Sequence, residues 1–380
     1  MHVLDQTGDG GAQLVIYQLI DSLKDLYSFS VVNLGLKGQF SEKYRSLGIP
    51  VFEMGNYLNR WEVFSSVGLF RLIREEHPDI LHTHLFKSNI LGVYAARFLH
   101  RKAILHDHTG VYPQNLTYYA HYIPKGLTRR LYLSAYQKSI LWSAKVIVLT
   151  PQMRDAYKDF YSLNGEKIMV LPNAVDIGLI DQGGISNGEI AIRDELGVQE
   201  GTKLIVMVGR LDPEKDWNTF LEVADRLKNQ IDLPIAFLVV GSGKLESQLR
   251  DIASRKKLDQ VYFLGYRNDI PKVLHQADVF LLTSRREPFG IVIIEAMAAG
   301  CPVVATRSGG PETIITDGET GLLAEVGDVR GLTDCIERLL SDKHLNQSMV
   351  EKARNKVVEE YSLKSAIANM NQIYMEILET

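Results

Sequence analysis

The chain has 380 residues, with 42 Lys and Arg against 46 Asp and Glu, and 46% of its residues are hydrophobic. This composition excludes disordered and fibrous proteins, and the length suits about two domains with separate cores. A net charge of −4 argues against a dedicated nucleic-acid-binding protein. The two cysteines, Cys301 and Cys335, exclude a disulfide framework and a four-thiolate zinc site. So few cysteines indicate a reduced, cytosolic setting. Because no apolar run is long enough to span a bilayer, we expect a cytoplasmic protein.

Short runs rich in Val, Ile and Leu alternate with segments of helical period, which is typical of parallel strands joined by crossover helices. The sequence therefore predicts two doubly wound α/β domains. In the first half, the expected strands are 2–4, 29–34, 51–54, 80–84, 103–106 and 146–150. In the second half, they are 204–208, 235–240, 261–264, 279–283, 303–306 and 322–325. The expected helices include 12–26, 61–76, 216–230, 244–257 and 332–340.

The natural domain boundary lies near Leu171-Pro172-Asn173, and the segment 181–188 that follows has no hydrophobic period and indicates a surface loop. We expect a first domain over residues 1–172, a second over 173–362 and a final helical segment over 363–380. Two doubly wound sheets that face each other form a cleft at the carboxyl ends of their strands. Ligands bind in such clefts.

Two cations follow the strand expected to end before Gly209. Arg210 and Lys215 lie in the loop that leads to the next helix. A guanidinium group forms forked hydrogen bonds to phosphate and an ammonium group adds a compact charge, so the pair suits a diphosphate. The alternative interpretation is that both are ordinary solvated cations.

A second motif, Glu287-Pro288-Phe289-Gly290-Ile291, follows the strand at 279–283 and opens a helix. Pro288 disfavours helical geometry at Glu287, so that carboxylate is expected in the loop. Gly290 allows a ligand to approach the backbone, and free amides at a helix N-terminus bind anions. Glu295 lies inside an otherwise apolar helix and needs a partner, which two ribose hydroxyls would supply. The two glutamates do not suit a retaining glycosidase, because eight helical residues span ~12 Å against the ~5 Å required.

Two histidine pairs, His82 with His84 and His106 with His108, lie at the carboxyl ends of expected strands. Alternate residues of a strand share one face, so each pair points the same way. One interpretation is a four-histidine metal site. The other, which we adopt, is a set of histidines hydrogen-bonded at the edge of the sheet, without a metal.

The order and spacing of these motifs resemble the retaining glycosyltransferases of family 4, also called glycosyl transferases group 1. The likeness covers nearly the whole chain and implies the GT-B fold, with two Rossmann-like domains facing across a cleft and a last helix that returns to the first domain. Besides residues 210, 215, 287 and 295, it rests on five segments. They are the glycine-rich loop at 10–13, the linker at 171–176, the loop at 239–243, and the late motifs at 309–312 and 317–323.

The resemblance implies a role for each matching residue. Arg210 and Lys215 would hold the donor diphosphate, Glu295 the ribose and Glu287 the transferring sugar. Glu287, His106, Arg210 and Lys215 would form the catalytic set, with His108 as a competitor for the sugar contact of His106. The other donor-binding positions would be Gly10, Gly11, Gly209, Gly241, Tyr266, Arg267, Phe289, Gly290 and Ile291.

A basic, aromatic stretch runs from Arg97 to Lys145, with eight basic residues and a single acid, Asp107. Its aromatic residues include Tyr112, Tyr118, Tyr119, Tyr122, Tyr132, Tyr136 and Trp142. Such a stretch suits an anionic membrane surface or a phosphorylated, lipid-linked acceptor, whereas the alternative is core aromatics with solvated cations. We assign to the acceptor or membrane side His84, His108, Lys125, Arg129 and Arg130.

We therefore expect a retaining enzyme that transfers a hexose-type sugar from a UDP- or GDP-sugar to a hydroxyl of a glycan or lipid-linked acceptor. The setting would be cell-surface polysaccharide or glycolipid synthesis, in the cytoplasm or on the inner face of the cell membrane. Protein cations and helix amides would stabilise the leaving diphosphate, so no metal cofactor is expected. No side chain stands out as a general base, and the resemblance implies that the leaving phosphate takes the proton. The alternatives are a sugar phosphorylase, a sugar-nucleotide epimerase and a catalytically silent nucleotide-sugar-binding protein.

Overall fold

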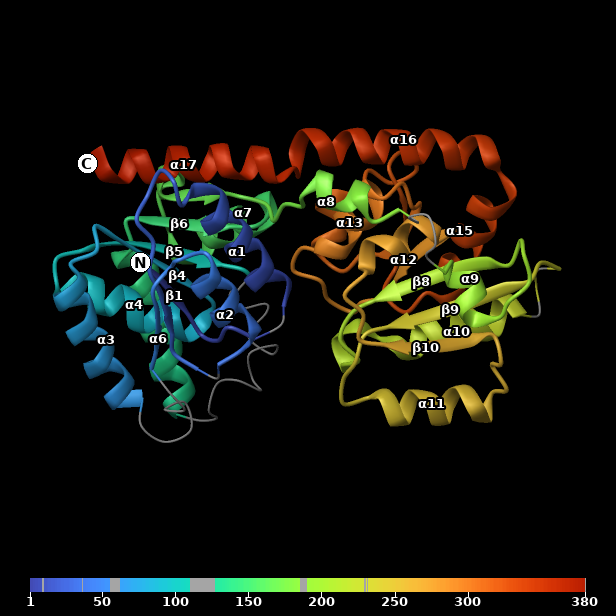
Figure 1. Ribbon diagram of the computed structural model, residues 1–380, viewed down its shortest axis with the longest axis horizontal. Helices are drawn as coiled ribbons and strands as arrows, with labels where there is room; N and C mark the ends of the chain where they lie inside the picture. The colour runs from blue at the N-terminus through green and yellow to red at the C-terminus, as the bar shows by residue number, and fades with distance from the viewer. Residues whose placement is uncertain are drawn as a thin grey trace. The chain divides into compact units, whose positions relative to one another are not determined.

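The computed structural model describes residues 1–8, 10–35, 37–54, 62–109, 127–184, 190–228, 230 and 232–379, with the backbone alone for 62–66 and 127–128. The chain divides into two compact units (Figure 1). The first unit is Met1–Asn173 with Leu363–Thr380, and the second is Ala174–Ser362. Each unit contains one parallel sheet with helices packed on it.

The described residues of the first unit form a seven-stranded sheet of order β3-β2-β1-β4-β5-β6-β7, with every pair parallel. The strands are β1 (His2–Leu4), β2 (Val31–Asn33), β3 (Val51–Glu53), β4 (Ile80–His84), β5 (Lys102–Asp107), β6 (Lys145–Val148) and β7 (Ile168–Val170). The register pairs His2 with His82, and His84 with His106. Histidines from three neighbouring strands are therefore adjacent.

Helices cover the first sheet, and the last helix of the chain is one of them. They are α1 (Gly11–Leu23), α2 (Gln39–Ser46), α3 (Glu62–Glu76), α4 (Phe86–Phe98), α6 (Leu127–Trp142), α7 (Pro151–Tyr161) and α17 (Leu363–Glu379). Helix α17 packs beside α1 (Figure 1) and buries Met370, Ile373 and Tyr374 among its inward residues. This packing brings residues from both ends of the sequence into one core.

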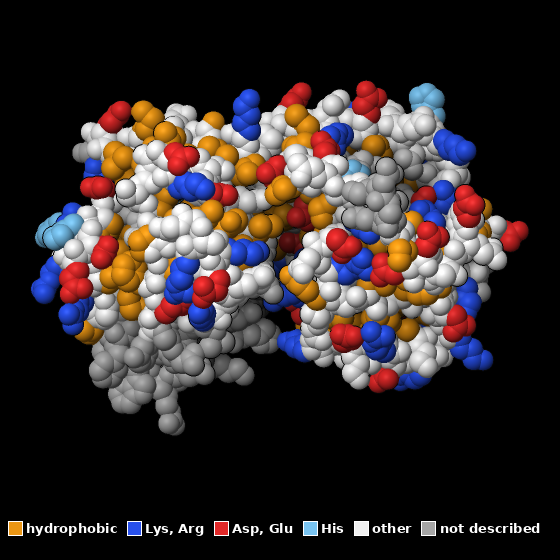
Figure 2. Space-filling model, viewed as in Figure 1, with side chains coloured by type: hydrophobic (Ala, Val, Ile, Leu, Met, Phe, Trp, Pro, Cys, Tyr) orange, Lys and Arg blue, Asp and Glu red, His pale blue; other side chains and the backbone are white. Residues whose placement is uncertain are grey.

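The second unit contains a six-stranded parallel sheet of order β10-β9-β8-β11-β12-β13. The strands are β8 (Lys203–Val208), β9 (Ile235–Val240), β10 (Val261–Gly265), β11 (Val279–Leu282), β12 (Val303–Thr306) and β13 (Leu322–Ala324). The helices are α8 (Ile177–Gln182), α9 (Ile192–Leu196), α10 (Trp217–Lys228), α11 (Glu246–Arg255), α12 (Ile270–Gln276), α13 (Ile291–Ala298), α14 (Pro311–Ile314), α15 (Val329–Ser341) and α16 (Lys343–Glu360). Figure 2 shows acidic and basic side chains interspersed on the visible face of this unit.

The strand order of each sheet reverses once, between β1 and β4 in the first unit and between β8 and β11 in the second. The prediction of two doubly wound parallel sheets is confirmed. In such sheets, ligands bind outside the carboxyl ends of the strands at the reversal. None of the helices in the described part of the chain is both long and apolar enough to cross a membrane.

Candidate active site

An ion pair joins the two loops at the reversal of the second sheet. The Lys215 ammonium, from the loop after β8, contacts the Glu287 carboxylate, from the loop after β11. The side chains are only 18% and 11% exposed, so little water screens the pair. The fold thus brings together two predicted site residues that lie 72 positions apart in the sequence.

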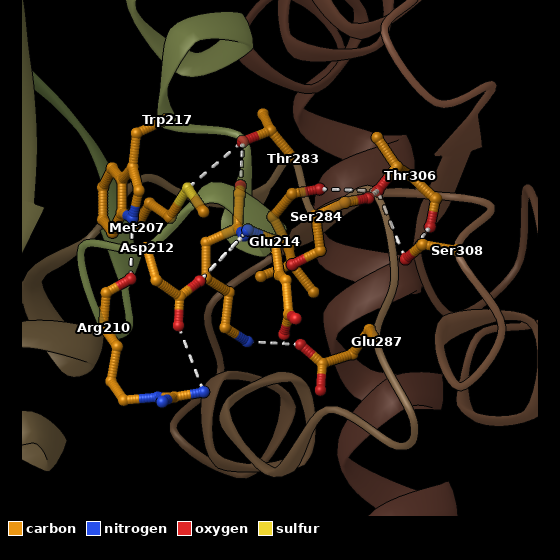
Figure 3. Close-up of polar contacts among 12 residues, drawn as sticks. Met207, Arg210, Asp212, Glu214, Trp217, Thr283, Ser284, Glu287, Thr306 and Ser308 are labelled. Carbon is orange, nitrogen blue, oxygen red and sulfur yellow. Dashed lines mark hydrogen bonds and ion pairs between the residues drawn. The ribbon is translucent and has the colours of Figure 1, made fainter. Parts of the chain in front are cut away.

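Asp212 organises the loop after β8. Its carboxylate accepts backbone hydrogen bonds from Glu214 at 3.1 Å and Lys215 at 3.4 Å, which caps a short 3-10 helix, Pro213–Lys215. The same carboxylate pairs with the Arg210 guanidinium at 3.1 Å (Figure 3). The buried indole of Trp217 donates to the Arg210 carbonyl at 2.9 Å. These hydrogen bonds fix the backbone at Arg210 and at Lys215, while the Arg210 side chain stays 65% exposed.

Thr283, directly after β11, ties this loop to the neighbouring strand. Its hydroxyl lies 3.1 Å from the Lys215 carbonyl and 3.0 Å from the Asp216 carbonyl. Asp216 adopts a left-handed conformation at φ 48°, and its buried carboxylate pairs with Arg285 at 3.0 Å. Because both loops are cross-linked by hydrogen bonds, the position of the Lys215 ammonium is defined before any ligand binds.

The segment after Glu287 is fixed to the loop that follows β12. The Glu287 amide donates to the Ser308 carbonyl at 2.9 Å, and the Gly310 amide donates to the Glu287 carbonyl at 2.6 Å. Any side chain at position 310 would collide with the backbone of Phe289, since a Cβ there would lie 2.2 Å from the Phe289 carbonyl oxygen. Phe289 itself is buried and has the aromatic ring of Tyr361 at its edge.

Helix α13 begins at Gly290, whose φ of 103° favours glycine. No side chain of the described residues caps this helix. The first backbone N–H groups of α13, beginning at Ile291, therefore remain available to an anion, and the helix dipole favours negative charge there. Lys215 and the N-terminus of α13 both adjoin Glu287, so positive potential surrounds this carboxylate.

Glu295 lies on α13 and is half-buried. Among the described residues, none forms a hydrogen bond or ion pair with its carboxylate. The side chain keeps some solvent contact, but burial of the carboxyl group raises its pKa to about 7. A carboxylate in such a place is costly unless a ligand supplies hydrogen-bond donors. Ribose hydroxyls remain the predicted partners.

Of the predicted donor-site glycines at 209 and 241, Gly241 has a structural explanation, whereas a Cβ at Gly209 would only make an ordinary contact with the Lys215 side chain at 3.4 Å. A Cβ at Gly241, where φ is 135°, would lie 2.0 Å from the Gly209 carbonyl oxygen. The loops after β8 and β9 therefore approach each other closely through backbone alone. This contact accounts for glycine at 241 whether or not a ligand also touches it.

Tyr266 and Arg267, which follow β10, differ in what surrounds them. The Arg267 guanidinium pairs with Asp269 at 2.7 Å and with Glu195 at 2.5 Å, and these carboxylates raise its pKa. Tyr266 is 57% exposed. Of the two residues predicted beside the nucleobase, Tyr266 is the one with an accessible ring, while Arg267 holds the end of β10 against α9.

The first unit places five buried histidines at adjacent positions on β1, β4 and β5 or directly after β5: His2, His82, His84, His106 and His108. Burial lowers the pKa of all five, to about 4 for His108, so they are neutral at pH 7. Two overlapping triplets could hold a metal ion, His2/His82/His84 and His84/His106/His108, with ligand atoms within 4.8 Å in each. Sequence reasoning did not single out His2, although His2 lies in the strand predicted at 2–4.

The first loop of this unit supplies the other predicted residues. Gly10 precedes α1 with extended backbone and without a side-chain cap, and a Cβ there would lie 2.3 Å from the Gln13 side chain. Gly11 begins α1. The N-terminus of α1 therefore lies at the carboxyl end of β1, beside the reversal between β1 and β4, where an anion would be favoured.

The predicted acceptor or membrane side is only partly described. Lys125 and four of the tyrosines, Tyr112, Tyr118, Tyr119 and Tyr122, lie outside the described residues. On α6, Arg129 is half-buried and Arg130 is exposed. The exposed face of this helix also carries apolar residues, with Leu131 63% and Trp142 37% exposed.

A cavity of about 500 Å³ lies at the opposite edge of the first sheet, near the amino ends of β1 and β4. Phe29, Asp79, His82 and Tyr374 are among its lining residues. None of the predicted donor-binding or catalytic residues lines it. The predicted site residues lie instead at the carboxyl ends of the strands, so this cavity does not coincide with the predicted site.

Comparison with known proteins identifies the family. Residues 9–179 match the sequence model of Glycosyltransferase Family 4, and residues 188–356 match that of Glycosyl transferases group 1. The chain belongs to the family 4 glycosyltransferases. This confirms the resemblance drawn from the motifs.

Two relatives illustrate the family. The chain is 28% identical over 325 residues to UDP-Gal:alpha-D-GlcNAc-diphosphoundecaprenol alpha-1,3-galactosyltransferase of Escherichia coli, covering 83% of this chain and 79% of that protein. It is 27% identical over 308 residues to 2-deoxystreptamine N-acetyl-D-glucosaminyltransferase of Niallia circulans, covering 79% and 77%.

Solved structures agree on the fold. The complex of Anabaena Alr3699/HepE with UDP-glucose superposes with a TM-score of 0.83 at 22% identity, covering 99% of both chains. WaaG, a glycosyltransferase involved in lipopolysaccharide biosynthesis, gives 0.72 at 17% identity, covering 96% of this chain and 98% of WaaG. This family 4 glycosyltransferase has the GT-B fold.

Proposed function

We propose that this glycosyltransferase moves a hexose-type sugar, with retention of anomeric configuration, from a nucleoside diphosphate sugar to a hydroxyl of a glycan or lipid-linked acceptor. The observation that carries the proposal is the Lys215–Glu287 ion pair beside the uncapped N-terminus of α13. A buried cation and free helix amides at a sheet reversal suit a diphosphate. The adjacent Glu287 suits the hydroxyls of the attached sugar.

The reaction needs charge stabilisation more than acid–base chemistry. As the bond between the sugar C1 and the diphosphate oxygen breaks, negative charge develops on the diphosphate. Lys215, Arg210 and the amides at Ile291 would stabilise this charge. The acceptor oxygen bonds to C1 on the face that the diphosphate leaves, and its proton passes to the departing phosphate oxygen. Atoms and charge balance without a protein base or a metal ion.

Glu287 would keep Lys215 in place. In the free protein, the ion pair holds the ammonium at one position. When a diphosphate binds, the ammonium would lie between two anions, the carboxylate and the phosphate. The side-chain entropy of Lys215 is then lost on folding and not on binding, which favours affinity for the donor.

The names of the relatives support a donor class and an acceptor class. The E. coli relative is named for a UDP-galactose donor and a diphosphoundecaprenol-linked acceptor, and the HepE complexes contain UDP and UDP-glucose. These names support a UDP-sugar ahead of a GDP-sugar here, and an acceptor carried on a lipid diphosphate. Peripheral association with an anionic membrane, through the exposed face of α6, fits such an acceptor.

The test has two stages. Thermal-shift titration with UDP, GDP and ADP, each compared with its nucleoside, identifies the base and shows whether the diphosphate matters. The preferred UDP- or GDP-hexose is then incubated with polyprenyl diphosphate sugars, and NMR of the product gives the anomeric configuration. Inversion would contradict the proposal. Turnover only with orthophosphate would indicate a phosphorylase, and conversion of the donor without acceptor would indicate an epimerase.

A further inference from the structure

A continuous chain of hydrogen bonds begins at the carboxyl end of β5. Nδ1 of His106 lies 3.3 Å from Nε2 of His82, in the neighbouring strand β4. Nδ1 of His82 lies 2.8 Å from the hydroxyl of Tyr374, which projects from the buried face of α17. These residues form the first arm of the chain, and Tyr374 is where it turns.

The second arm returns from Tyr374 to the carboxyl end of β5. The Tyr374 hydroxyl lies 3.1 Å from Nε2 of His2, on β1. Nδ1 of His2 lies 2.9 Å from Nε2 of His84, and Nδ1 of His84 lies 3.1 Å from Nε2 of His108. Five histidine rings and one phenol are therefore linked end to end, with no side branch between the rings.

Two sets of tautomers give every contact one donor and one acceptor while the Tyr374 hydroxyl also donates to one of the two rings beside it. A neutral imidazole carries one N–H group and one unprotonated nitrogen. Every ring–ring contact joins Nδ1 of one histidine to Nε2 of the next, and the Tyr374 hydroxyl joins Nδ1 of His82 to Nε2 of His2. When the hydroxyl donates to one ring and accepts from the other, all contacts are satisfied with the five rings all protonated at Nε2, or all protonated at Nδ1. If the hydroxyl accepted from both rings, the two arms would differ in tautomer and its proton would have no acceptor among the described residues. A single deviating ring would set two N–H groups or two lone pairs against each other in a buried place.

The ends of the chain are the two atoms that lack partners. Nε2 of His106 and Nδ1 of His108 are buried, and no described residue forms a hydrogen bond with either. The two rings stack with their centroids 4.0 Å apart. In the first arrangement, the His106 nitrogen is a donor and the His108 nitrogen an acceptor; in the second, the roles are exchanged. In both of these arrangements, the ends offer one donor and one acceptor.

We propose that the five histidines and Tyr374 act as one tautomer-coupled unit whose two ends bind a hydroxyl group of a neutral sugar. Tyr374 is then a positioning residue, because it couples the arms that end at His106 and His108. A hydroxyl group both donates and accepts, so it suits either arrangement, whereas a phosphate group only accepts and an ammonium group only donates. The identity of the ligand as a sugar rests on the proposed function; the coupling of the rings does not.

The state of each ring can be observed directly. Long-range ¹H–¹⁵N NMR spectra of the full chain, labelled with ¹⁵N-histidine and kept in EDTA at pH 7, show which ring nitrogen carries the proton. We expect the five histidine rings that are linked by hydrogen bonds to share one tautomer. The internal reference is the remaining histidines, His77, His100, His121, His275 and His344. Mixed tautomers among the five, a cationic ring among them or a tightly bound transition metal would each overturn the proposal.

Tyr374→Phe removes the link and keeps the ring. We expect His106 and His108 to lose their shared tautomer, and the KM for the nucleotide sugar to rise about three- to tenfold, as the loss of one hydrogen bond implies. The affinity for free nucleoside diphosphate should not change. Tyr27→Phe is the matched control, since the Tyr27 hydroxyl donates to Asn371 of the same helix at 2.7 Å.

The outcomes separate the two proposals. If the five rings still share one tautomer in Tyr374→Phe, Tyr374 does not couple the two arms. If that variant does not fold, the tautomers in the wild-type spectrum still test the proposal. A shared tautomer in a wild-type protein that uses no nucleotide sugar would leave the coupled unit intact and overturn the proposed function.

Discussion

Lys215 and Glu287 form an ion pair across the point where the strand order of the second sheet reverses. Both residues are mostly buried, so the pair exists before a donor arrives and any ligand there meets a carboxylate and an ammonium together. Breaking a buried pair leaves the remaining charge without a partner, which is costly. A bound phosphate would relieve that cost for Lys215. The pair therefore links the stability of the free protein to its affinity for the donor.

Glu287→Gln should separate donor binding from turnover. The substitution removes the anion that competes with phosphate for Lys215, so UDP should bind with unchanged or higher affinity. Turnover should fall by about tenfold or more, because the predicted contact with the transferring sugar would be lost. Calorimetric titration with UDP and steady-state kinetics measure the two effects. Weaker UDP binding with normal turnover would reverse the assignment.

Removal of either cation should affect the diphosphate selectively. A hydrogen bond to a charged group contributes about 1.5–3 kcal/mol, so Arg210→Ala or Lys215→Ala should weaken UDP binding at least about tenfold. Uridine, which lacks phosphate, should bind both variants like the wild type. Lys256→Ala is the control, since Lys256 pairs with Asp225 at 2.7 Å on an exposed surface. Equal losses for UDP and uridine would show that the loop itself had changed.

The motif residues were predictable individually, but their pairing was not. Glu287 and Lys215 each follow an apolar strand run, and the strands at 80–84 and 235–240 were predicted with the bounds that the structure has. Buried parallel strands are continuous apolar runs, which is why they are recognisable. That the two residues meet depends on β8 and β11 being neighbours, which follows from the sheet order and not from local sequence.

The histidine chain shows what sequence reasoning missed. His82, His84, His106 and His108 were noted as pairs, yet the hydroxyl that joins the two arms belongs to Tyr374. Tyr374 and His2 are 372 positions apart and meet only because α17 packs on the first unit. Strand β7 was also missed, because its apolar run leads directly into the segment Leu171-Pro172-Asn173 that indicates the domain boundary.

Glu295→Gln should change how stability depends on pH. Burial raises the pKa of Glu295 from 4.5 to about 7, so between these values the folded protein binds more protons than the unfolded chain. The Glu295 contribution to the free energy of unfolding therefore falls as pH rises from about 4.5 to 7 and is constant above. At pH 8, Glu295→Gln should be more stable by at most about 3 kcal/mol, and by less where solvent reaches the carboxyl.

The stability of this variant should come with weaker donor binding. If the ribose hydroxyls donate to Glu295, UDP should raise the melting temperature of Glu295→Gln less than that of the wild type. Denaturant unfolding at pH 5 and pH 8, with and without UDP, measures both effects. If the free energy of unfolding changes equally with pH in both proteins, the pKa of Glu295 is not raised by folding. If UDP raises both melting temperatures equally, Glu295 does not bind the ribose.

Chelation should leave the activity largely unchanged. In the proposed site, Lys215, Arg210 and the amides at the start of α13 would neutralise the diphosphate in place of a magnesium ion. The rate of sugar transfer in EDTA should therefore equal the rate with added Mg²⁺ or Mn²⁺. Activity that is lost in EDTA and restored only by a divalent ion would contradict this expectation and direct attention to the triplet His84, His106 and His108.

The exposed face of α6 combines charge with apolar surface in a way that suits an anionic membrane. Arg130 and Lys138 are exposed on this helix, and Leu131 and Trp142 lie among them. Each Lys or Arg near an anionic surface contributes about 1 kcal/mol, and added salt weakens this attraction. Three Lys or Arg side chains near the surface would therefore change the partition constant between membrane and water by about 100-fold at low salt.

Replacement of Lys125, Arg129 and Arg130 by Ser should therefore reduce sedimentation with phosphatidylglycerol liposomes by about 100-fold at low salt. UDP affinity should be unchanged, because the predicted diphosphate and ribose contacts belong to the second unit. The matched control replaces Lys24, directly after α1, with Lys43 of α2 and Lys158 of α7, which removes the same charge from other parts of the first unit. If both triple variants lose binding equally, net charge and not the α6 face is responsible. If the wild-type protein does not sediment with these liposomes at all, the membrane assignment is wrong and α6 presents ordinary solvated surface.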